Sequence, residues 1–203
     1  MDTQKAADEL MVIRQLMERP IRYSTMSGLS GIWAGLVALG GLAVDDWICG
    51  RHGPRTAMWI NLAVWAGVLL LAAGGVLVLT HIRERRQGMP AWSNVKKRIA
   101  MTILPCLAGG VGLTLVIIRI WYTHEGPNEW GLIPAIWMCF YGVALWQLGE
   151  FSPVEVRVLG AAFILGGLVS AGWLQVQPYW ALGLSFGALH ILYGIVVWIR
   201  YGG

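Results

Sequence analysis

The residue with the clearest chemical potential is a histidine inside an apolar run near the end of the chain. His190 stands near the centre of LGLSFGALHILYGIVVW, residues 182–198, a run long enough to cross a bilayer as a helix. An ionisable side chain at membrane depth is costly, so it predicts a function: proton relay, solute contact, or ligation of a metal or haem. The alternative is structural, with neutral His190 donating a hydrogen bond to a neighbouring helix and Ser185 and Tyr193 making polar contacts beside it.

A haem site would need a second axial ligand at the depth of His190. The remaining histidines are predicted at span ends or in loops: His52, His81 and His124. Met101 or Met138 would then be the axial partner, and methionines in apolar runs usually belong to the core. We therefore expect no cofactor, with haem kept as an alternative.

A second group of potential ligands follows the first apolar run. Asp45, Cys49 and His52 stand close together in a predicted outer loop, and the Cys-x-x-His spacing suits zinc or copper. The two paired ligand sets of a strong zinc motif are not present. The alternative is a solvated loop in which Gly53-Pro54 turns the chain into the next span.

Polar side chains scattered through the apolar runs predict hydrogen-bonding groups for a solute pathway. The selected residues are His190, Tyr193, Ser185, Asn61, Tyr141 and Gln147. No predicted span carries an acidic residue near its centre, whereas cation-coupled transporters commonly use one. A passive channel or facilitator for a small neutral solute therefore fits the sequence better than a pump.

The sequence offers little that is typical of an enzyme. Its GxSxG match, GLSFG at residues 183–187, stands inside a predicted span and not at a strand-to-helix turn. It contains no HExxH, no glycine-rich phosphate loop after a strand and no pair of membrane-embedded aspartates. We therefore expect no catalytic residues and no enzymatic activity.

Composition indicates that these residues lie in a membrane protein. Hydrophobic residues make up 57% of the chain and charged residues 13%, against about 25% charged in a soluble domain. The net charge of +4 comes from short basic clusters beside apolar runs, which set membrane topology, so no nucleic-acid partner is expected. The three cysteines have no CxxC spacing and predict no disulfide framework.

The predicted fold class is all-α, a single transmembrane domain of six spanning helices over residues 26–203. Each span is judged against a need for about 20 apolar residues. The predicted spans are Ser27–Trp47, Met58–Ile82, Ile99–Trp121, Trp130–Leu148, Val154–Trp173 and Tyr179–Ile199. Pro105 and Pro134 predict kinks in the third and fourth spans. Short connections predict that consecutive helices are antiparallel neighbours.

Residues 1–25 are predicted to form a cytoplasmic amphipathic helix at the membrane interface. Ala6, Leu10, Ile13 and Met17 share one side of that helix, and Pro20 ends it. The helix is either an anchor in the headgroup layer or a docking site for a cytosolic protein through residues 1–20. A docking role would suit a membrane sensor or scaffold that also uses the basic loop of residues 83–98.

Basic residues near the span ends predict the orientation. Of the 15 lysines and arginines, twelve fall on one side of the predicted bundle, and only Arg51, Arg55 and Arg119 fall on the other. Both termini are therefore predicted to be cytoplasmic, which agrees with an even number of spans.

Glycines on the first and last spans predict close helix packing. Gly183, Gly187 and Gly194 share a side of the last span, and Gly31 and Gly35 recur at four-residue spacing in the first. Such faces favour packing within one bundle, with a homodimer as the alternative. In the turn before the fifth span, Ser152-Pro153-Val154-Glu155 predicts a helix start, with an ion pair between Glu150 and Arg157 beside it.

The segments LMERPIRYSTMSGLSGIWAGLVAL and FGALHILYGIVVWIRYGG resemble small uncharacterised bacterial six-span inner-membrane proteins. The resemblance implies a multi-pass location in the bacterial inner membrane, with lipids as partners, and transfers no activity and no site residues. The leading functional prediction is a passive channel or facilitator with a cavity near His190. The alternatives are a non-transporting sensor or scaffold and a haem-binding or metal-binding membrane protein.

Overall fold

The structure is a computed structural model that describes residues 28–86, 94–124, 131–150, 152–173 and 177–201. These residues form helices, and no strand occurs among them. The helices are α2 (Gly28–Cys49), α3 (Pro54–Arg86), α4 (Asn94–His124), α5 (Leu132–Leu148), α6 (Val154–Trp173), α7 (Pro178–Leu184), the π-helix η2 (Ser185–Leu189) and α8 (His190–Tyr201). The predicted interfacial helix of residues 1–25 and part of the basic loop lie outside the described residues.

Five of the helical segments are long and apolar enough to cross a membrane. They are Gly28–Cys49, Thr56–Arg86, Lys97–Thr123, Val154–Gly172 and Pro178–Tyr201. α5 is apolar but shorter, at 17 residues. The prediction of an all-helical protein with several long apolar helices is therefore confirmed.

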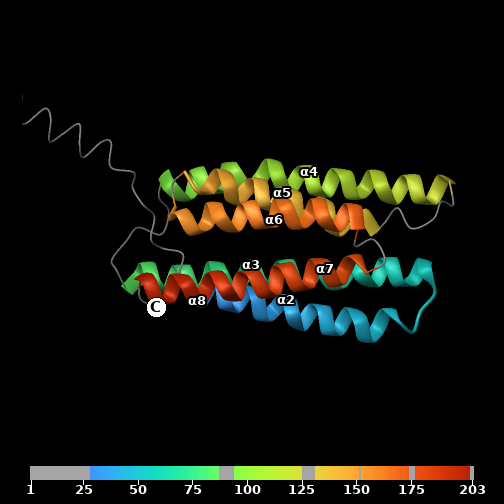
Figure 1. Cartoon of the computed structure of the whole chain (residues 1–203), viewed down its shortest axis with the longest axis horizontal. Helices are drawn as coiled ribbons and strands as arrows, with labels where there is room; N and C mark the ends of the chain where they lie inside the picture. Colours follow the sequence, from blue (N-terminus) through green and yellow to red (C-terminus); the bar gives the residue numbers. More distant parts are fainter. Residues whose placement is uncertain (1–27, 87–93, 125–130, 151, 174–176, 202–203) are drawn as a thin grey trace, which may run out of the picture.

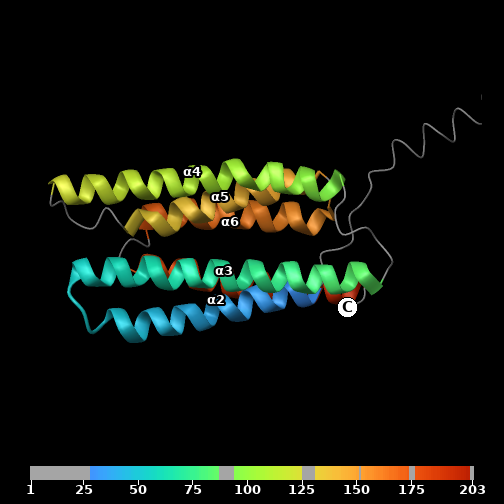
Figure 2. The ribbon, with the colours of Figure 1, turned by 180° about the vertical axis from the view of Figure 1, so that it is seen from behind.

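The helices form two layers (Figure 1). One layer holds α4, α5 and α6, and the other holds α2, α3 and the last span, which runs through α7, η2 and α8; the view from behind agrees (Figure 2). The last span returns to pack against α2, the first described helix. The prediction that consecutive helices are neighbours is therefore wrong for α3 and α4, because α3 packs on α2 and α4 packs on α5.

The glycines predicted on the first and last spans lie against each other. A Cβ atom built on Gly35 would lie 2.6 Å from the carbonyl oxygen of Gly187, and one built on Gly194 would lie 2.7 Å from the amide nitrogen of Ile32. Both neighbours are backbone atoms, so no side chain fits at either position. The backbones of α2 and the last span touch because these residues are glycine.

A second glycine contact joins α5 to α6. A Cβ atom on Gly142 would lie 2.7 Å from the carbonyl oxygen of Gly160, and one on Gly160 would lie 2.8 Å from that of Gly142. Sequence analysis did not select either residue. This close crossing holds together the layer that faces the last span.

The two prolines for which kinks were predicted occupy different positions in their helices. Pro134 stands in the first turn of α5, where backbone amides have no partner within the helix, so its missing N–H costs little. The prediction of a kinked span at Pro134 is therefore wrong. Pro105 does lie inside a helix, α4.

The outer helices expose their apolar side chains. None of the most apolar stretch of α3 is buried, and Leu70, Leu71 and Leu77 are exposed on it. α4 likewise exposes Leu104 and Leu115. A helix that is apolar all round and unburied is stable in lipid and costly in water. The arrangement is compatible with an integral membrane protein.

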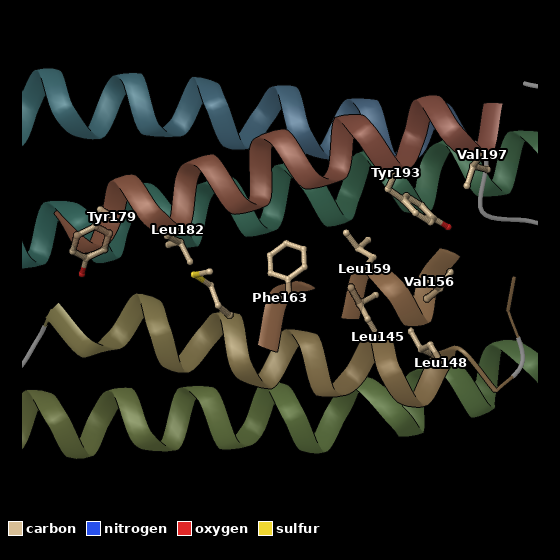
Figure 3. Packing of buried hydrophobic residues seen from close by; sticks show 10 residues of the cluster. Leu145, Leu148, Val156, Leu159, Phe163, Tyr179, Leu182, Tyr193 and Val197 are labelled. Carbon is tan, nitrogen blue, oxygen red and sulfur yellow. The ribbon is translucent and has the colours of Figure 1, made fainter. Parts of the chain in front are cut away.

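The core lies between the two layers. Figure 3 shows its side chains pointing from both layers toward their interface. The buried members are Met138, Leu145, Leu148, Val156, Leu159, Phe163, Tyr179, Leu182, Tyr193 and Val197. At the end of the bundle marked C in Figure 1, Arg200 of α8 pairs with Glu155 of α6, which links the layers by charge. The predicted ion pair between Arg157 and Glu150 is also present, at 2.6 Å.

Candidate functional site

His190 follows a π-helical turn in the middle of the last span. η2 covers Ser185–Leu189, and His190 is the first residue of α8. A π turn shifts the backbone hydrogen bonds by one residue and often marks a functional position. The side chain of His190 is buried, with 7% of the residue exposed. The turn therefore sets the direction in which an enclosed imidazole meets the opposite layer.

Both imidazole nitrogens of His190 are engaged. Nδ1 lies 2.9 Å from the carbonyl oxygen of Phe186, which only accepts hydrogen bonds, so Nδ1 carries a proton and donates. In the neutral ring Nε2 is then an acceptor, and the hydroxyl of Tyr141 donates to it over 2.7 Å. This arrangement joins α8 to α5 across the layer interface and leaves neither nitrogen open for a haem iron.

Aromatic rings surround the imidazole. Phe186 stacks on His190 with ring centroids 5.7 Å apart, and Phe163 of α6 meets it edge-on at 5.3 Å. Tyr141 contacts both phenylalanines, with centroids 4.9 Å apart in each pair. Sequence analysis missed Phe163 and Phe186. Phe186 was detectable because it stands four residues before His190 and so shares its helix face, whereas no local signal marks Phe163.

A cavity of about 90 Å³ lies beside His190. Its lining comes from both layers: Ser30, Gly31, Ala34, Val76, Tyr141, Leu145, Val156, Leu159, His190 and Tyr193. Ser30, Tyr141 and Tyr193 contribute hydroxyl groups, and His190 contributes the imidazole. The cavity is thus a small, mostly apolar space with a few polar side chains on its wall.

The structure brings together only part of the predicted pathway. Tyr141, Tyr193 and His190 line one cavity, with Gly31 at its wall. Ser185 lies near Gly166 of α6 and is not part of the lining. Asn61 is buried elsewhere, and Gln147 is exposed on the outside of α5.

Searches with the chain matched no protein-family model, no curated protein and no solved structure.

The predicted outer loop is partly helix. Asp45 lies inside α2 and is 4% exposed, so its placement in a solvated loop is wrong. Its carboxylate accepts a hydrogen bond from the Cys49 thiol over 3.5 Å. Turned with Nδ2 toward α2, the Asn61 amide donates to both carboxylate oxygens. Helix α2 continues through Asp45 because a neighbouring helix supplies the donor that the buried charge needs.

The proposed metal ligands meet only in part. Cys49 contacts Asp45, but His52 is exposed, and its Nδ1 donates to the carbonyl oxygen of Ile48 over 2.9 Å. Among the described residues, no group of three or more His, Cys, Asp and Glu side chains is placed to hold a metal ion. The three cysteines are free.

Proposed function

We propose that the chain is a six-span integral membrane protein that lets a small neutral solute cross along the interface between its two helical layers. The observation that carries the proposal is the cavity beside His190, because it lies where α2, α3, α5, α6 and α8 meet. A space lined by helices of both layers changes size when the layers move relative to each other. Such relative movement of helix groups is how many membrane transporters open a site.

The closed state follows from the contacts around the cavity. The Tyr141–His190 hydrogen bond and the rings of Phe163 and Phe186 fill the layer interface beside it. A solute would pass when this hydrogen bond breaks and the rings separate. Opening costs little free energy, because a hydrogen bond between membrane helices contributes only about 0.6 kcal/mol on average.

The proposal includes the sixth span and the orientation. α5 is an apolar helix of 17 residues, which is at the lower limit of about 17 residues for a spanning helix. The excess of lysine and arginine at one side favours cytoplasmic termini in a bacterial inner membrane. Under this orientation the cavity lies in the cytoplasmic half of the bundle, near the end that holds the C-terminus (Figure 1).

A non-transporting scaffold is the second candidate. Both His190 nitrogens already have partners within the protein, which is what a purely structural histidine requires. A scaffold would keep this interface closed and show no solute flux.

Flux into proteoliposomes distinguishes the two. We expect the purified protein to accelerate the entry of water or a small neutral solute, and His190→Ala to change that rate at least threefold. Gln147→Ala is the matched control, because Gln147 is polar, belongs to a layer-interface helix and points outward. No acceleration over protein-free vesicles for any solute would favour the scaffold.

A further inference from the structure

The polar groups on the wall of the His190 cavity already have partners. Tyr141 donates to Nε2 of His190, and Nδ1 of His190 donates to the carbonyl oxygen of Phe186. Ser30 and Tyr193 have interaction partners as well. The other side chains of the lining contribute only carbon: Ala34, Val76, Leu145, Val156 and Leu159. Such a wall favours an apolar ligand, because a polar one would lose its hydrogen bonds to water without replacing them.

Helix α3 forms the outer wall of the cavity, which is partly open and includes Val76. Among the described helices, α3 packs closely against α2 alone. It meets α4 at the end away from the C-terminus, where Nε1 of Trp59 donates to the Tyr122 hydroxyl over 3.1 Å. Nearer the C-terminal end both helices are uncovered, with Leu77 of α3 70% exposed and Met101 of α4 64% exposed. The open side of the cavity therefore lies along α3, at the outer surface of the bundle.

A cationic side chain lies on the same face of α3 as Val76. Arg83 follows Val76 by two helical turns and is partly buried. It belongs to the last turn of α3 together with Arg85 and Arg86, which are exposed. Basic residues at the membrane surface attract anionic lipid headgroups. At about 1.5 Å per residue, Arg83 lies about 10 Å from Val76 along the helix.

These dimensions fit a phospholipid. An acyl chain spans half of the hydrocarbon core, or roughly 15 Å. A chain whose headgroup lies at Arg83 therefore reaches Val76 with about 5 Å to spare. The cavity has a volume of about 90 Å³. It has room for about four carbon atoms, by proportion to an apolar cavity of about 150 Å³ that holds the six carbons of benzene.

We infer that the protein binds an anionic phospholipid, with the headgroup at Arg83 and the end of one acyl chain in the cavity beside His190. The inference rests on the membrane location in the proposed function and does not require solute passage. An acyl chain and a solute would share one space, so the bound lipid inhibits the proposed passage.

Native mass spectrometry of the full-length protein in detergent tests the headgroup site. The protein is titrated with phosphatidylglycerol, which is anionic, and with phosphatidylcholine of the same acyl chains, which has no net charge. We expect the first phosphatidylglycerol to bind about fivefold more tightly than phosphatidylcholine. Arg83→Gln should remove this preference. Arg85→Gln is the matched control and should retain it, because Arg85 lies on another face of the same turn.

The same titration tests the chain site with variants that fill the cavity. Val76→Phe should weaken the binding of phosphatidylglycerol about tenfold, whereas Val78→Phe, at a residue 57% exposed on the same helix, should leave it unchanged. Ala34→Leu fills the cavity from α2 and covers the case in which Val76→Phe does not fold.

Three results would overturn the inference: equal binding of the two lipids to wild type, a preference that survives Arg83→Gln, or unchanged binding in the folded cavity-filling variants. None of them bears on solute passage, because the titration measures no flux.

Discussion

Tyr141 and His190 form a direct hydrogen bond between the two helical layers. The Tyr141 hydroxyl on α5 donates to Nε2 of His190 on α8 over 2.7 Å. The bond fixes the imidazole because the other nitrogen is held by the carbonyl of Phe186. The two residues stand 49 positions apart in the chain, so the contact depends on the return of the last span to the opposite layer.

Removing the Tyr141 hydroxyl should destabilise the closed interface. Tyr141→Phe keeps the ring contacts and deletes one donor, so we expect the free energy of unfolding to fall by about 0.6–1.7 kcal/mol. Reversible unfolding in detergent and SDS measures this change. In a double-mutant cycle with His190→Phe the coupling energy should account for most of it. Two single effects that simply add would mean that the bond contributes nothing.

The glycine contact between α2 and the last span predicts a strong position effect within one helix. Gly35→Ala places a methyl group 2.6 Å from a backbone carbonyl that cannot rotate away, so unfolding should become easier by about 1–3 kcal/mol. Gly40 lies on the same helix with nothing within 4 Å of a built Cβ atom. Gly40→Ala should therefore leave the melting temperature unchanged or raise it. Equal effects of the two variants would contradict the close crossing.

The buried Asp45 carboxylate depends on Asn61 of α3. Asn61→Leu leaves the charge without its amide donor, and we expect a loss of about 1–3 kcal/mol in the free energy of unfolding. Replacing both partners, as Asp45→Leu with Asn61→Leu, should recover part of that loss because neither the carboxylate nor the amide is then left buried without the other. A double variant that is less stable than either single variant would argue against this pairing.

Charge holds the layers together at the end that carries the C-terminus. Glu155 in the first turn of α6 pairs with Arg200 in the last turn of α8, and the Tyr201 hydroxyl lies 3.3 Å from the same carboxylate. Both charges also suit the dipoles of their own helices. Arg200→Gln should speed amide hydrogen exchange in the last turn of α8, and the difference from wild type should shrink in high salt.

Arg157→Gln is the control for that measurement. Arg157 pairs with Glu150 at the end of α5, so this ion pair stays within one layer. The variant should leave exchange in α8 unchanged. Faster exchange in α8 for both variants would show that the effect is a general loss of charge and does not come from the link between layers.

Features of the fold that depend on residues close together in the sequence were predicted correctly. Val154 begins α6 as the Ser152-Pro153 turn predicts. His190 was selected as the ionisable residue at mid-depth of an apolar run, and the structure buries it between the layers. Glycine spacing marked faces on both the first and last spans. The contact between those faces was not predictable, because either could have packed against another helix or another copy of the chain.

The remaining features depend on partners from distant segments. Asp45 next to Asp46 is typical of a loop, and only the arrival of Asn61 makes its burial tolerable. The π turn at Ser185–Leu189 has no sequence signature. Gln147 was chosen for its polarity alone, and its orientation depends on which face of α5 meets α6.

Solute passage through the His190 cavity is tested most directly by a variant that fills the cavity from its edge. Val76→Phe places a ring in the space beside His190, whereas Val78→Phe puts the same ring on the outer side of the same helix, at a residue that is 57% exposed. Urea flux in proteoliposomes, normalised to the amount of folded protein, is the measurement. We expect Val76→Phe to lower the flux at least tenfold and Val78→Phe to leave it unchanged. Undiminished flux through Val76→Phe would contradict passage through the cavity.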